Sequence, residues 1–393
     1  MTATFAELWA EIAPIGRDDK GGYLRYALSE PELILRDWFR NQADRREMPV
    51  TEDGNGNLFA WWGRPWAAGT VLTGSHFDSV PHGGGFDGPL GIVSAFLAVD
   101  LMRGRGLQPE KPLAVAAFVE EEGGRFGVPC LGSRLLTGVI DPDVAGALRD
   151  ADGVRFDDAL GGRPAGPLPV LGRVSAVVEL HIEQGRALCE GDAPVGVASA
   201  IWPHGRWRMD FAGDGDHAGT TRMVDRHDPM LTFAYTVLAA DKEARLSGAH
   251  ATVARVAVEP NATNAIPSLV RGWLDARAAD TPTLDRLVEA VVKRAVERAG
   301  RDGTRVDIEP ESVSPEVVFD APLVSRLAGL LGGAPILPTG AGHDAGVLSA
   351  HVPTAMLFVR NPTGVSHSPA EHATEADCVA GVEALAKVLG ELT

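Results

Sequence analysis

Four short apolar stretches, each followed at once by histidines or carboxylates, constrain the fold of this chain more than any other feature. They lie at residues 70–73, 113–119, 174–180 and 353–359. Their apolar composition, rich in β-branched residues, predicts buried strands. Helical patterns lie between them, for example at residues 90–101. Strands that alternate with helices predict an α/β domain in which helices flank a mostly parallel central sheet.

The middle of the chain has a different pattern, in which strands with alternating apolar and polar residues are separated by helical stretches. Such strands bury one face only, so we expect helices on one face of a small sheet. This predicts a smaller α+β domain at residues 205–318, inserted into a larger domain of residues 1–204 and 319–393. The strand-like stretches are 206–211, 251–258 and 270–277, and the helical stretches are 229–245 and 283–299.

The charge and the cysteine content exclude several classes of protein. The chain has 36 Lys and Arg against 53 Asp and Glu, a formal net charge of −17, which repels phosphate backbones and anionic lipids. We therefore expect no nucleic-acid partner and no membrane partner. The 3 cysteines include no C-x-x-C pair, which argues against a disulfide framework and against a cysteine-built zinc site.

The N-terminal sequence and the hydropathy pattern bear on where the protein resides. The opening residues lack the basic region and the apolar region of a signal peptide. No apolar run approaches the roughly 18 residues of a transmembrane helix. We therefore expect an acidic, cytoplasmic, globular protein.

Polar residues that can bind a metal follow each of the four predicted strands. Because ligands bind at the carboxyl ends of parallel strands, we expect these loops to meet at one edge of the sheet. Imidazole and carboxylate groups together form a metal site of nitrogen and oxygen ligands. The residues are His76 and Asp78, then Glu120, Glu121 and Glu122, then His181, Glu183 and Gln184, and finally His367 and Glu371.

Each of these loops also has a plain structural explanation. A histidine after a strand is usually a surface or core residue, and a run of acids is usually a solvated turn. Asp87, in the sequence GGGFDG, is equally suited to the first turn of a helix. However, the acids at 120–122 end an apolar strand, where like charges are unfavourable unless a cation offsets them. The four loops together favour the metal site.

A series of longer motifs identifies the family that the chain resembles. In order, they are GSHFDSVPHGGGFDGPLG, EEGGRFG, ELHIEQG, HAGTTRM, NATNAIP, GAGHDAG and GVSHSPAEH, and they span residues 74–372. They resemble the N-carbamoyl-L-amino-acid hydrolase and allantoate amidohydrolase branch of the aminoacylase-like dinuclear metallopeptidases. The string ELHIEQG is typical of this hydantoinase/carbamoylase branch, because ordinary peptidases of the superfamily tend to carry a carboxylate at the position of His181.

The resemblance implies a site for two divalent metal ions, which Zn, Mn, Co or Ni could fill. Asp87 would bridge the two ions. His76 and His181 would complete the first site, and Glu122 and His367 would complete the second.

The resemblance also implies roles for residues beside the ligands. The carboxylate of Asp78 would fix the tautomer of His76. Glu121 would be the general base, since it precedes a ligand and so lies beside the metal-bound water. Glu120 remains an ambiguous third acid.

Substrate binding, by the same resemblance, involves the inserted domain, which in relatives is a lid and also forms the dimer. His217 and Asn264 would polarise the scissile carbonyl, and the guanidinium of Arg277 would bind the substrate carboxylate. Gln184 would lie near the ureido group. Without the resemblance, His217 is better explained as a turn residue and Arg277 as a surface residue of a strand. A two-fold homodimer is expected, with His217 reaching the partner's site.

The expected function is hydrolysis of the ureido C–N bond of an N-carbamoyl-L-amino acid to the amino acid, CO₂ and ammonia. Allantoate amidohydrolase is the nearest alternative, and the motifs do not separate the two. An aminoacylase or a dipeptidase is a third possibility, and a binding protein that has lost its metal is a fourth. The metal and the side-chain preference of the substrate stay open.

Overall fold

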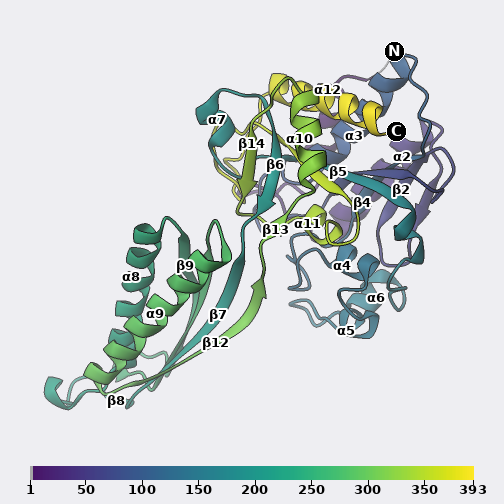
Figure 1. Ribbon diagram of the computed structural model, residues 1–393. Coiled ribbons are helices and arrows are strands. Elements are labelled where there is room, and N and C mark those ends of the chain that lie inside the picture. Colours follow the sequence, from purple (N-terminus) through teal and green to yellow (C-terminus); the bar gives the residue numbers. More distant parts are fainter. Residues whose placement is uncertain (1–2) are drawn as a thin grey trace. The chain divides into compact units, whose positions relative to one another are not determined.

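The computed structural model describes residues 3–393 and divides them into two compact units (Figure 1). The first unit contains the residues up to Ala200 together with Val318–Thr393. The second unit contains Ile201–Val317. The second unit is therefore inserted between two parts of the first.

A sheet of nine described strands forms the centre of the first unit. Its order is β1-β2-β4-β3-β5-β15-β6-β13, and β14 also pairs with β6. The neighbours β4, β3, β5 and β15 run parallel, whereas β1 with β2, β2 with β4, and β6 with β15 form antiparallel pairs. The strands are β1 (Val50–Glu52), β2 (Leu58–Trp62), β3 (Thr70–His76), β4 (Leu113–Phe118), β5 (Val174–Ile182), β6 (Val195–Ile201), β13 (Val317–Val318), β14 (Ile336–Thr339) and β15 (Thr354–Val359).

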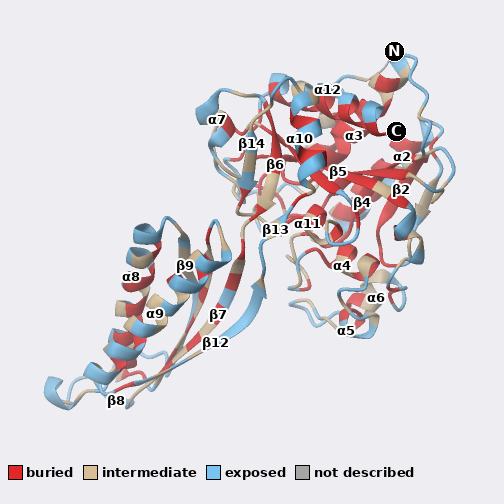
Figure 2. Cartoon of the chain, in the orientation of Figure 1, coloured by how far each residue is buried: buried red, intermediate tan, exposed pale blue. Residues whose placement is uncertain are grey.

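The central strands are buried over almost their whole length, as Figure 2 shows. Strand β4, with the sequence LAVAAF, has no polar side chain, because both faces of a parallel sheet are covered. Helices α3 (Pro89–Gly104) and α12 (Glu375–Leu392) pack against each other and against β5. The first unit is therefore a mixed α/β fold with a largely parallel central sheet, which confirms the fold class predicted from the sequence.

The remaining helices of the first unit are shorter than α3 and α12. None of the helices within residues 3–393 combines the length and the apolar character needed to cross a membrane. They are α1 (Phe5–Ile12), α2 (Glu30–Asp44), α4 (Leu131–Thr137), α5 (Pro142–Gly146), α6 (Phe156–Leu160), α7 (Ala187–Gly191), α10 (Ala321–Leu330) and α11 (Asp344–Leu348), with a 3-10 turn at Pro169–Arg173.

The second unit is a four-stranded antiparallel sheet covered on one face by two helices. Its strand order is β12-β7-β11-β9. Trp207, Met209 and Phe211 point from β7 toward the helices, and the residues between them point to the open face. The elements are β7 (His204–Ala212), β8 (Asp216–His217), a 3-10 turn at Met223–Asp225, α8 (Pro229–Ser247), β9 (His250–Glu259), β10 (Ala265–Ile266), β11 (Leu269–Arg277), α9 (Thr281–Asp302) and β12 (Arg305–Ser314).

Strand β12 is absent from the sequence-based prediction. It lies at an edge of the sheet and contains Pro310, which argues against a strand when only the sequence is considered. Its inward residues Val306 and Ile308 are only partly buried, so the apolar signal is weak. Edge position tolerates the proline, because one side of the strand needs no partner.

Candidate metal centre

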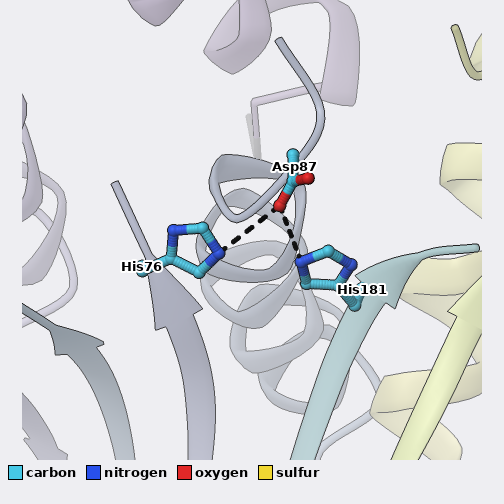
Figure 3. A group of neighbouring side chains, drawn as sticks. All are labelled: His76, Asp87 and His181. Carbon is cyan, nitrogen blue, oxygen red and sulfur yellow. Dashed lines mark ion pairs between the residues drawn. The ribbon is translucent and has the colours of Figure 1, made fainter. Parts of the chain in front are cut away.

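Two imidazoles and a carboxylate meet at the carboxyl ends of the central strands (Figure 3). His76 ends β3, His181 lies near the end of β5, and Asp87 lies in the loop before α3. The Oδ1 atom of Asp87 is 3.5 Å from Nε2 of His76 and 3.1 Å from Nε2 of His181. All three residues are buried. This edge of the sheet therefore gathers side chains from distant parts of the sequence.

A second group of potential ligands shares Asp87 and adds Glu122 and His367. The Nε2 atom of His367 lies 3.4 Å from Oδ2 of Asp87 and 3.3 Å from Oε2 of Glu122. The two oxygens of Asp87 thus face two different sets of ligand atoms. This is the arrangement of a carboxylate that can bridge two cations, and it brings together every residue expected to be a ligand.

The hydrogen bonds of the two buried imidazoles test whether a cation fits the first group. Nδ1 of His76 lies 3.0 Å from the carbonyl oxygen of Asp78, and Nδ1 of His181 lies 2.9 Å from that of Ile182. A carbonyl only accepts, so Nδ1 carries the proton of the neutral ring and Nε2 carries the lone pair. Within residues 3–393, neither Nε2 atom has a hydrogen-bond partner. Two lone pairs aimed at a carboxylate oxygen fit a divalent cation.

The pKa shifts of His367 and Asp87 in the second group also bear on whether a cation fits. Burial lowers the pKa of His367, but hydrogen bonds to Asp87 and Glu122 outweigh it and raise that pKa to about 11. Burial raises the pKa of Asp87, but the neighbouring His181 and the other imidazoles hold it well below its usual range. Asp87 is therefore ionised, and its negative charge favours a cation beside it.

The three acids that follow β4 point in three different directions. Glu122 contacts His367, whereas Oε2 of Glu121 lies 3.7 Å from Nε2 of His76. Glu120 turns away, and its Oε1 atom accepts the backbone N–H groups of Arg125 and Phe126. The ambiguous third acid is therefore a residue that holds the following turn.

Glu121 lies beside the first group and is buried. Burial raises its pKa well above the usual value. Its Oε1 atom lies 3.6 Å from Sγ of Cys130. Burial also raises the pKa of the Cys130 thiol well above its usual value, so the thiol keeps its proton and donates it.

Asp78 contacts His76 through both its carboxylate and its backbone carbonyl. Its carboxylate is 3.6 Å from Nδ1 of His76, while its backbone carbonyl is 3.0 Å away and takes the hydrogen bond. The carboxylate instead accepts the backbone N–H groups of Glu121 and Glu122, at 3.1 and 3.0 Å. The side chain of Asp78 therefore also holds the loop that carries the acids, and its main chain accepts the hydrogen bond from Nδ1 of His76.

The two polar residues after His181 have separate places. The carboxylate of Glu183 accepts the N–H groups of Ala187 and Leu188 at the start of α7, so it is not among the ligands. Nε2 of Gln184 donates to Oδ2 of Asp87 at 2.7 Å. Its Oε1 atom is buried and has no hydrogen-bond partner among the described residues.

His343 lies at the site although no role was assigned to it from the sequence. Its ring is 4.5 Å from the ring of His181, and neither of its nitrogens has a hydrogen-bond partner in the described part of the chain. Burial and the positive charge that His181 can carry lower the pKa of His343 well below its usual value, so the ring is neutral. The motif GAGHDAG is visible in the sequence, but β14 before it is too short and too exposed to be recognised as a strand.

The second unit brings two of the expected substrate-binding residues together. His217 in β8 pairs with Ala265 in β10, and the N–H group of Ala218 donates to the carbonyl of Asn264 at 2.9 Å. His217 and Asn264 are therefore neighbours, and both are exposed.

Arg277 lies at the opposite end of the same unit. It is the last residue of β11 and pairs with His204, where the chain enters the unit, whereas Leu269 at the other end pairs with Ala212, shortly before β8. A strand of 9 residues spans about 26 Å at roughly 3.3 Å per residue. Nε of Arg277 donates to Oδ1 of Asp275 at 2.9 Å.

Comparisons with known proteins give a consistent result. The chain matches the model of peptidase family M20/M25/M40 over residues 72–391. It is 37% identical to the N-carbamoyl-L-amino acid amidohydrolase of Geobacillus stearothermophilus, over 97% of this chain and 96% of the relative. It is 31% identical to the allantoate amidohydrolase of Escherichia coli, over 97% of this chain and 95% of the relative. The crystal structure of a hydantoinase/carbamoylase-family amidase from Burkholderia vietnamiensis is similar with a TM-score of 0.88 and 30% identity, covering 99% of this chain and 96% of that one.

The shared carboxylate leads to a prediction about metal content. We expect Asp87→Ala to lose both divalent ions, because Asp87 belongs to both groups, and His181→Ala to lose only one. Zinc bound per chain, measured by mass spectrometry after dialysis, tests this expectation. His351→Ala, an exposed residue outside both groups, is the matched control. If Asp87→Ala kept one ion at the affinity of the unmodified chain, Asp87 would not be shared.

Proposed function

The chain belongs to peptidase family M20/M25/M40, and on that premise we propose that it is an N-carbamoyl-L-amino-acid hydrolase. Such an enzyme cleaves the ureido C–N bond and releases the amino acid, CO₂ and ammonia. The observation that carries the proposal is the pair of ligand groups sharing Asp87, with Glu121 beside them. The 37% identical relative named for this activity supports the choice of substrate class.

The roles of the ligand residues follow from their two groups. His76, Asp87 and His181 would hold one divalent ion, and Asp87, Glu122 and His367 the other. Zn, Mn, Co and Ni are all compatible with nitrogen and oxygen ligands. Such ions, when bound, lower the pKa of water and polarise the substrate carbonyl.

Glu121 is the residue that moves the proton in this proposal. Its carboxylate takes a proton from the attacking water, whose oxygen forms the new bond to the carbamoyl carbon. Glu121 then gives that proton to the nitrogen of the C–N bond that breaks. The carbamate left by this cleavage loses CO₂, so that the amino acid and ammonia are both released. Asp78 supports this role, since its carboxylate holds the backbone N–H group of Glu121.

The remaining substrate contacts are proposed from the second unit and from Gln184. The guanidinium of Arg277 would bind the substrate carboxylate, for which its planar donors suit a bidentate pair. His217 and Asn264 would donate to the carbonyl oxygen as negative charge develops there. Gln184, whose Oε1 atom has no hydrogen-bond partner among the described residues, would lie near the ureido group and accept a hydrogen bond from its nitrogen.

The length of β11 supports a homodimer in which two copies build each site. A carbamoyl amino acid is about two residues long, roughly 7 Å, so one molecule cannot reach both ends of β11. Residues at the two ends can contact the same substrate only if they come from different copies. Strand β9 offers a surface for this, since it lies at the edge of the sheet, and the adjacent α8 exposes Leu231 and Leu238.

Allantoate hydrolysis is the second candidate. Allantoate also carries a carboxylate and ureido groups, so the same residues would act on it, and the relative from E. coli is named for that activity. An aminoacylase or dipeptidase would act on an acyl rather than a ureido bond. A ureido substrate releases ammonia and an acyl substrate does not, which separates these candidates.

Ammonia release tests the substrate directly. We expect chelator-treated protein to release no ammonia, and protein restored with Zn²⁺, Mn²⁺, Co²⁺ or Ni²⁺ to release it from N-carbamoyl-L-amino acids in preference to the D-forms. Release from allantoate alone would instead assign the second candidate. No ammonia from either, with metal bound, would exclude both and direct the assay to N-acyl amino acids.

The general base has its own test. We expect Glu121→Gln to lower kcat by about 10²–10⁴-fold, since the amide cannot accept the proton. Its zinc content should stay that of the unmodified chain, because Glu121 belongs to neither ligand group. Glu289→Gln, on the exposed side of α9, is the control. Near-normal turnover by a fully loaded Glu121→Gln protein would remove Glu121 from this role.

Mixing two inactive variants tests the shared site. We expect His217→Ala and Arg277→Ala each to lose activity, and their mixture, after subunit exchange, to regain about a quarter of it. Random pairing makes half of the dimers mixed, and each mixed dimer has one site with both residues intact. A mixture that stays inactive, although exchange is shown by mass, would place both residues in the same copy's site or outside it.

A further inference from the structure

Glu371 joins two loops that each carry a potential metal ligand. It follows His367 in the loop after β15 and is buried, with 5% of its surface exposed. Its Oε1 atom accepts the backbone N–H groups of Phe86 and Asp87, at 2.9 and 3.0 Å. The same carboxylate therefore links the loop of Asp87 to the loop of His367.

The loop of Asp87 is shaped to admit this carboxylate. A Cβ atom at Gly84 would lie 2.2 Å from Oε1 of Glu371, a distance that no side chain can occupy. Glycine at this position lets the carboxylate reach the backbone. The opposite side of the loop is held as well, because the ring of Phe86 stacks on Trp9 in α1 at 4.5 Å. The loop thus has little freedom to move away from Glu371.

The side chain of Asp87 belongs to the same network. The hydroxyl of Ser366 lies 3.3 Å from Oδ2 of Asp87 and 3.3 Å from Oε2 of Glu371, and donates its single proton to one of them at a time. The two carboxylates are therefore linked both through the backbone and through Ser366.

The two ligand groups differ in what holds their residues in place. In the first group, His76 and His181 lie on β3 and β5, whose backbone hydrogen bonds fix them. In the second group, Glu122 and His367 lie in loops after their strands, and Asp87 is also in a loop. The N–H group of Glu122 is held by Asp78, but nothing in the sheet aligns Asp87 with His367. Glu371 aligns the two loops through the backbone, while Nε2 of Gln184 contacts the side chains, 2.7 Å from Oδ2 of Asp87 and 3.4 Å from Nε2 of His367.

We propose that Glu371 is a positioning residue that prepares the second group, Asp87 with Glu122 and His367, for its metal ion. This proposal shares one premise with the proposed function, namely that the chain binds two divalent ions. Loss of Glu371 frees the Asp87 loop from the His367 loop, which weakens the second ion. The first ion keeps His76 and His181 on their strands and the Asp87 carboxylate, which Gln184 still holds. Removing residues that orient metal ligands typically costs about 10–100-fold in metal affinity.

Zinc binding to the full-length protein, followed by calorimetry in chelator-buffered solutions, tests this proposal. We expect two ions for the unmodified chain, and for Glu371→Ala one ion of unchanged affinity and a second weakened by about 10–100-fold. Glu371→Gln keeps an oxygen that accepts both N–H groups, so its loss should be smaller. Glu383→Gln, an exposed acid on α12, should bind both ions normally.

Double variants identify which ion is affected. Glu371→Ala combined with His367→Ala should bind zinc no more weakly than His367→Ala alone, because both changes act on one ion. Glu371→Ala combined with His181→Ala should weaken the ion that His181→Ala retains. Equal weakening of both ions, or normal binding by Glu371→Ala, would overturn the proposal.

The outcomes separate this proposal from the proposed function. A chain that binds two zinc ions but releases no ammonia would refute the function and leave the positioning role testable by the same titration. Thermal unfolding of the metal-free variants shows whether each one is folded. If Glu371→Ala is not folded, the zinc titration is made with Glu371→Gln, which keeps the shape of the side chain.

Discussion

The concentration of buried carboxylates at one edge of the sheet is the constraint on which the rest of the site depends. Asp78, Asp87, Glu121 and Glu371 are all buried within a short distance of two imidazoles that present unpaired lone pairs. Such a cluster is unfavourable unless positive charge is supplied and every remaining oxygen is hydrogen-bonded. Backbone N–H groups supply many of the hydrogen bonds to these carboxylate oxygens, and two divalent ions would supply the positive charge.

Sequence alone could locate most of this arrangement because its signals are local. A buried parallel strand is a continuous apolar run, and the polar residue at its end stands out, so His76 and His181 could be placed at one sheet edge. Glu120 and Glu121 are adjacent and chemically alike, and only the folded backbone shows that one holds a turn while the other faces His76. The direction in which the backbone points each of these side chains cannot be predicted from the residue type.

Contacts between loops that are distant in the chain could not be predicted from the sequence for a related reason. The bond from Phe86 to Glu371 joins residues far apart in the chain, and no periodicity records such a pairing. Strand β12 was missed because it lies at the edge of the sheet. Its alternation of apolar and polar residues is weak there, and the edge position tolerates a proline that would argue against an inner strand. The separation of His217 from Arg277 likewise depends on register in the second sheet, which one sequence does not specify.

The place of β15 in the central sheet has a consequence for the order in which this protein can be made. β15 comes from the last part of the chain, yet it lies between β5 and β6, parallel to one and antiparallel to the other. While the ribosome is still making the second unit, β5 has an open edge that no later strand has yet covered. The sheet, and with it the loop of His367, can close only after the second unit and β15 have been made, and until then that edge is exposed to pairing with other chains.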